Sequence, residues 1–185
     1  MLRFGDVECD FEINTNLEAK ISDIFTEDLK NICLKQLVQN LLSNKDNNNR
    51  IIKFFLDWFD GNGGENNIVF SETTSFDILY GAYKSDTIKL NSYTLPAASA
   101  EYVTSVIAQE MIHAIMSMGT QGAYSIGQLY QHISIFKSWS EDIASLLVDI
   151  YSIPLRDAAA LSIGGISDVF KDEGISSNSE IFATL

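Results

Sequence analysis

The residues best suited to take part in a chemical reaction are Gln109, Glu110 and His113, which lie inside the apolar run 103–118. Read as a helix, this run is apolar nearly all the way round, so it is expected to be buried. Most of its polar side chains share one face, because residues four apart lie one helical turn apart. They are Ser105, Gln109, His113 and Ser117, with Glu110 one step away. A carboxylate on a buried helix costs free energy unless it is paired or used, so Glu110 is the first candidate for a functional residue.

The spacing of Glu110 and His113 resembles the motif helix of zincin metallopeptidases, His-Glu-x-x-His. In the intact motif the two histidines bind Zn²⁺ and the glutamate activates the metal-bound water. Here Gln109 stands where the first histidine belongs, while the glutamate and the second histidine are present. The competing reading is an ordinary core helix in which a glutamate and a histidine stand three residues apart.

Composition limits the classes of partner. With 185 residues, 46% of them hydrophobic and 20% charged, the chain can form one domain with a substantial core. A net charge of -13 argues against nucleic acid or an anionic membrane surface as the main partner, although solubility also explains it. No stretch has the pattern of a signal peptide, and no apolar run is long enough to span a membrane. We therefore expect a soluble chain. Such a chain can still be a piece of a longer, exported protein.

Cysteine usage gives a weaker prediction. Cys9 and Cys33 are the only two cysteines, and they lack the C-x-x-C spacing of a redox or metal motif. We expect core thiols, with a disulfide left open.

Apolar periodicity and turn residues predict the elements that position the motif. Helices are expected over 26–43 with Thr26 as the cap, over 50–59, over the motif run, over 128–152, and over 155–163 before a Gly-Gly pair. Strands of one sheet are expected over 68–70, 76–83 and 87–91, with a hairpin turn at Asp86. We therefore expect a helical segment of the same domain over 1–67, a core over 68–175 and a loosely ordered tail over 176–185.

This order of elements looks like the minimal zincin core, and it resembles the bacterial polymorphic-toxin metallopeptidase domains more narrowly. The residues that carry the likeness are Ile88-Lys89-Leu90-Asn91, the lead-in Leu95-Pro96-Ala97-Ala98-Ser99, the helix 108–114, His132 at the start of a helix, and Gly164-Gly165-Ile166. The likeness covers about residues 68–170. It implies an α+β fold of zincin type, mostly helical, with a small sheet packed on the motif helix.

The resemblance also implies roles for particular residues. His113 and His132 would be zinc ligands with Gln109 at the first ligand position, and Glu110 would be the general base for peptide-bond hydrolysis. The strand 88–91 would be the sheet edge that holds an extended peptide substrate. A peptide or protein substrate, a cognate immunity protein and a toxin or effector role follow from the same likeness.

Gln109 leaves several accounts open. A neutral carboxamide is a poor zinc ligand, so zinc is expected to be weak or absent if Gln109 is native. The chain could be a peptidase silenced by substitution, a natural pseudopeptidase that binds a protein partner, or an enzyme that recruits another ligand. The carboxylates available for that last account are Glu141, Asp142 and Asp149. A purely structural or inhibitory helical module is the alternative from another class.

Overall fold

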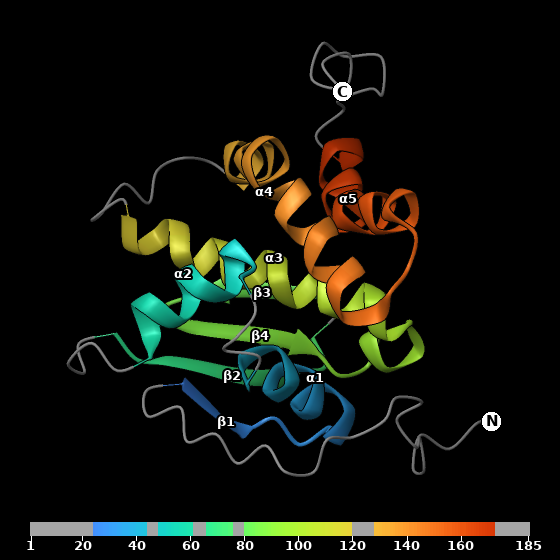
Figure 1. Ribbon diagram of the computed structural model, residues 1–185. Coiled ribbons are helices and arrows are strands. Elements are labelled where there is room, and N and C mark those ends of the chain that lie inside the picture. Colours follow the sequence, from blue (N-terminus) through green and yellow to red (C-terminus); the bar gives the residue numbers. More distant parts are fainter. Residues whose placement is uncertain (1–23, 44–47, 61–65, 76–79, 120–127, 173–185) are drawn as a thin grey trace.

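The computed structural model describes residues 24–43, 48–60, 66–75, 80–119 and 128–172 (Figure 1). The elements in chain order are β1 (Ile24–Asp28), α1 (Ile32–Ser43), α2 (Arg50–Phe59), β2 (Ile68–Thr73), β3 (Gly81–Lys84), β4 (Thr87–Asn91), the 3-10 helix η1 (Leu95–Ala97), α3 (Ala100–Gly119), α4 (Gln128–Tyr151) and α5 (Leu155–Asp172). This is the α+β class that the sequence predicts. The first 23 residues and the predicted tail 176–185 lie outside the described residues.

One mixed sheet contains the described strands, in the order β1-β2-β4-β3. β1 and β4 both run parallel to β2, whereas β3 pairs antiparallel with β4. Ser85 and Asp86 have positive φ angles of 49° and 57°, so the predicted hairpin turn at Asp86 is confirmed. The prediction that strand 88–91 is an edge is wrong, because β4 lies between β2 and β3. The hairpin places β3 on the outer side, so β3 is the edge strand beside β4.

The helix predicted from Thr26 begins later than expected, because residues 24–28 form β1. Ile24 pairs with Ile68 and Phe25 with Val69, and this long-range pairing overrides the local helical signal. The true N-cap is Asn31, whose Oδ1 accepts hydrogen bonds from the backbone N–H groups of Cys33 and Leu34, both at 3.1 Å. A carboxylate oxygen of Glu72 accepts from the N–H groups of Lys30 and Asn31, where it also complements the helix dipole.

Cys33, near the start of α1, is disulfide-bonded. The expectation of a core thiol is therefore wrong at this position. Cys9, the only other cysteine in the sequence, lies outside the described residues. The missing C-x-x-C spacing gave no information on such a bond, because a structural disulfide needs closeness in space and not in sequence.

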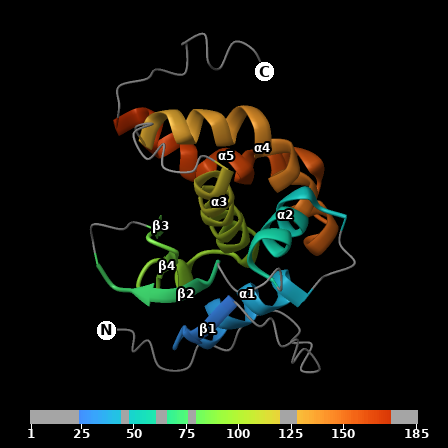
Figure 2. The same ribbon diagram turned by 90° about the vertical axis from the view of Figure 1, so that its left-hand side faces the viewer.

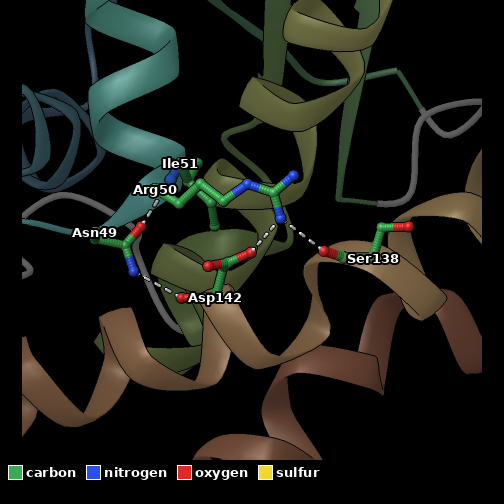
Figure 3. Close-up of polar contacts among 5 residues, drawn as sticks. All are labelled: Asn49, Arg50, Ile51, Ser138 and Asp142. Atoms are coloured by element: carbon green, nitrogen blue, oxygen red, sulfur yellow. Dashed lines mark hydrogen bonds and ion pairs between the residues drawn. The ribbon is translucent and has the colours of Figure 1, made fainter.

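The helix predicted over 50–59 is confirmed with the same bounds as α2. Asn49 caps it by accepting from the N–H of Ile51 at 2.9 Å, and its amide also donates to the carbonyl of Asp142 at 2.8 Å (Figure 3). Arg50 donates to the carboxylate of Asp142 at 3.1 Å and to the carbonyl of Ser138 at 3.2 Å. Its guanidinium lies 4.0 Å from the ring centroid of Trp139. Together these contacts join the start of α2 to α4.

α3 lies in the middle of the molecule, with the sheet on one side and the α4–α5 pair on the other (Figures 1 and 2). It contacts α1, α2, α4, α5, β3 and β4, which confirms that the motif helix is buried on nearly all sides. Ser99 caps its first turn by accepting from the N–H of Tyr102 at 3.3 Å, and Gly119 is its last residue. Among the described helices, none combines the length and the apolar character needed to cross a membrane.

α5 is longer than the sequence predicts. Its helical hydrogen bonding continues through Gly164 and Gly165 to Asp172, whereas the glycine pair was expected to end it. Glycine in a helix interior costs roughly 1 kcal/mol relative to alanine, which packing can offset. Here α5 packs along α4 and against α3. Tertiary contacts therefore decide the length of this helix.

Candidate functional site

Glu110 is buried on α3, with 8% of its surface exposed, and it faces the edge strand β3. Burial raises the pKa of its carboxyl group to about 8, and a hydrogen bond from the backbone N–H of Tyr83 opposes part of that rise. At neutral pH the group is therefore mostly protonated. A carboxyl group with a pKa of about 8 is suited to donate or accept a proton under physiological conditions.

The register of the β3–β4 hairpin explains why Tyr83 is available to Glu110. The N–H of Asn91 donates to the carbonyl of Tyr80 at 2.8 Å, and Gly81 lies opposite Leu90 in the next pair. Bonded and non-bonded pairs alternate along an antiparallel ladder. The backbone groups of Gly81 and Tyr83 therefore point away from β4, and the N–H of Tyr83 meets the carboxyl group.

Gly81 allows this close approach. A Cβ atom at this position would lie 2.9 Å from Cγ and 3.1 Å from Oε1 of Glu110, and 3.1 Å from Val106. A side chain at residue 81 would therefore push the carboxyl group away from the edge strand.

Replacing Gly81 with alanine is expected to lower the free energy of unfolding by about 1 to 3 kcal/mol, the usual cost of overpacking. Urea unfolding of Gly81→Ala, Glu110→Ala and the double variant measures the coupling. The double variant should recover part of the loss, because truncating Glu110 makes room for the new methyl group. Strictly additive effects would contradict the contact.

Tyr83 ties β3 to α3 at a second point. Its hydroxyl group lies 2.8 Å from Oγ of Ser117 and 3.2 Å from Oδ1 of Asp86. Ser117 in turn donates to the carbonyl of Ala114 at 2.7 Å. Sequence reasoning placed Ser117 on the polar stripe but missed Tyr83 and Gly81. The signal that could have found them is the predicted turn at Asp86, since the hairpin register fixes which residues face outward on the edge strand.

Gln109 points in a different direction from Glu110. It is 7% exposed, and its Nε2 donates to the carbonyl of Ser162 in α5 at 3.1 Å. One turn earlier, Oγ of Ser105 donates to the carbonyl of Leu161 at 2.9 Å. The first half of the polar stripe therefore faces α5, whereas Glu110 and Ser117 face β3.

His113 is half-buried, and at 100° per residue it lies on α3 between the direction of Gln109 and that of Glu110. His132 lies in the first turns of α4, and its side chain is outside the described part of the structure. That the two histidines converge on one metal ion stays a prediction. Glu110 and His113 are brought to one face of α3, and Gln109 adjoins them on the side of α5.

The carboxylates considered as replacement ligands do not gather at this face. Asp142 forms an ion pair with Arg50, while Glu141 and Asp149 are exposed on α4. Within the described ranges, no three side chains of histidine, cysteine, aspartate and glutamate come close enough to hold a metal ion.

Comparison of the chain with protein-family models, with curated proteins and with solved structures gives no match.

Proposed function

We propose that this chain is a zincin-type domain derived from a zinc metallopeptidase, with hydrolysis impaired by Gln109. In the parent reaction, His113, His132 and a histidine at residue 109 would hold zinc, which would supply an activated water for peptide-bond cleavage, and Glu110 would accept and pass on the proton of that water. The arrangement that supports a zincin-type core is a small mixed sheet whose last strand leads through a short turn into a buried motif helix.

The single observation that carries the proposal is the position of Glu110. A buried carboxyl group that costs stability is held by the backbone of an edge strand, one turn before a half-buried histidine. An ordinary core helix gains nothing from such a group, because an apolar residue there would avoid the desolvation cost. Costly, well-positioned titratable groups concentrate at functional sites.

The donor set on the described residues does not fit zinc as it stands. His113 is the one imidazole among the described side chains, and the amide of Gln109 is engaged with Ser162. Zinc sites in enzymes use three protein ligands, most often histidines and carboxylates. The chain's own contribution to hydrolysis is thus the Glu110 carboxyl group, which can give or take a proton while one of its oxygens accepts a hydrogen bond from the N–H of Tyr83.

The test compares zinc binding and peptide hydrolysis of this chain with those of Gln109→His. Restoring the imidazole should raise zinc affinity by about a hundredfold, the share of one ligand in a typical zinc site. Peptidase activity should appear in Gln109→His and disappear in Gln109→His with Glu110→Gln. His113→Ala in the same background is the matched control that removes the second ligand. If Gln109→His takes up no more zinc than the parent chain, the proposal fails.

A second candidate is a pseudopeptidase that binds a protein partner. The observation that favours it is the hydrogen bond from Gln109 to the carbonyl of Ser162. The side chain at the first ligand position is thus bonded to α5 and is not available to a metal ion. Under this candidate, Gln109→His stays inactive and Glu110→Gln leaves partner binding unchanged. For either candidate, a peptide or protein substrate or partner and a cognate immunity protein are proposals from the resemblance to toxin domains.

The disulfide at Cys33 supports a version of this function in which the domain is exported as part of a larger protein. Structural disulfides persist in oxidising compartments and are rare in the cytosol. A toxin or effector domain that acts after export fits that chemistry.

A further inference from the structure

We propose that Ser105 and Gln109 act as a two-point clamp that positions α5 on α3, and that residue 109 must supply an N–H donor to the Ser162 carbonyl. The clamp is present in the chain without metal or substrate, and it does not depend on the proposed hydrolysis. The two donors lie one turn apart on α3, and their acceptors are consecutive carbonyls of α5, Leu161 at 2.9 Å and Ser162 at 3.1 Å. The two bonds therefore join one full turn of α3 to neighbouring residues of α5.

The composition of α5 explains why polar contacts matter there. Gly164 and Gly165 stand in its interior, where each weakens the helix. Two of the residues of α5 at this contact are small: a Cβ atom at Gly164 would lie 3.5 Å from the ring of Tyr102, and Ser162 is buried. These two residues bury little apolar area, so the hydrophobic burial of α5 comes from other residues such as Ala158, Leu161 and Ile163. The two hydrogen bonds are made by buried donors and therefore add to it.

Both donors would be costly to leave without acceptors. Ser105 is 1% exposed and Gln109 is 7% exposed, so neither can turn to water while α5 is in place. Removing an acceptor from a buried donor leaves its desolvation cost uncompensated. Because the acceptors are neighbouring residues, movement of this part of α5 away from α3 breaks both bonds together, which makes the clamp cooperative.

The clamp sets a chemical requirement at residue 109. Glutamine meets it through its amide N–H, and a neutral histidine can meet it through one ring N–H while its other nitrogen stays available. Methionine has nearly the same length as glutamine but no donor, and glutamate has no donor when ionised. If the proposed function holds, the Ser162 carbonyl would also select the tautomer of a histidine at residue 109, as carbonyls do behind metal-bound imidazoles.

Hydrogen–deuterium exchange of the full chain in the presence of EDTA tests the clamp without metal or substrate. In Gln109→Met, the amides of α5 that follow Ser162 should exchange about threefold to tenfold faster, the effect of losing one hydrogen bond. The amides of β2, in the sheet on the opposite side of α3 from α5, are the internal control and should be unchanged. Gln109→His should stay within about twofold of the parent chain.

Ser105→Ala is a second, independent test of the clamp, because it removes the other hydrogen-bond donor with little change in side-chain volume. It should speed exchange in the same part of α5. Unchanged α5 exchange in both Gln109→Met and Ser105→Ala overturns the clamp, as does a Gln109→His variant as perturbed as Gln109→Met. These outcomes do not depend on zinc, so they are separate from a failure of the proposed function, which is read from zinc affinity and hydrolysis.

Discussion

Replacing Glu110 with glutamine should flatten the pH dependence of stability between about pH 5 and pH 8. The folded pKa is about 8, whereas the ordinary carboxyl value is 4.5. Between these two values the folded chain holds a proton that the unfolded chain has released. The parent chain should therefore lose up to about 1.4 kcal/mol of unfolding free energy per pH unit as the pH rises through this window. Below this window the Glu110 carboxyl group is protonated in both the folded and the unfolded chain, and above it the group is ionised in both. Its contribution to the slope therefore vanishes at both ends.

Urea unfolding from pH 4.5 to 8.5 measures the effect. The glutamine variant keeps a carbonyl oxygen to accept from the N–H of Tyr83 but does not titrate, so its stability relative to the parent should rise with pH across the window. The side-chain NH₂ of the new glutamine also affects the absolute stability of the variant. The slope of the unfolding free energy against pH is therefore the informative quantity. Glu141→Gln, at an exposed position on α4, is the matched control and should leave the slope unchanged. Parallel profiles for Glu110→Gln and the parent would show that Glu110 is ionised in the folded chain.

Reducing the disulfide at Cys33 should lower the unfolding free energy by about 2 to 4 kcal/mol, because the bond restricts the unfolded chain. Equilibrium unfolding with and without a phosphine reductant measures the loss. Cys33→Ser should match the reduced parent and should not respond to reductant. The sequence contains Cys9 as the only other cysteine, so a peptide map without reduction should recover Cys33 joined to the Cys9 peptide.

Equal stability of the oxidised and reduced parent would remove the structural importance of this bond. It would also remove the support that the bond gives to an exported form of the protein. A mixed disulfide with an external thiol in the peptide map would contradict an internal bridge.

Much of the helical architecture was predictable, because the relevant signals are local. The apolar spacing from Arg50 to Phe59 and the asparagine before it determine α2. The all-round apolar character of 103–118 predicts a buried helix, and α3 is contacted on nearly every side. The turn at Asp86 follows from a short-range preference for turn residues. In each case the free energy depends on residues within about one or two turns of each other.

Predictions that depend on partners distant in sequence were less successful. Residues 24–28 carry a helical signal but pair with β2, more than forty residues later. The position of β4 inside the sheet depends on β2 and β3 together. α5 runs through its glycines because α3 and α4 stabilise it.

The sequence by itself determined that Gln109, Glu110 and His113 lie on one buried helix and that Glu110 needs an explanation. Only the tertiary structure decided which neighbour each of them meets. Glu110 meets the outward N–H of Tyr83, and Gln109 meets the carbonyl of Ser162. Adjacent residues on a helix point about 100° apart, so two neighbours in the sequence face different elements of the fold. Helical spacing fixes those directions, but the strand and the helix that occupy them are set by packing over the whole chain.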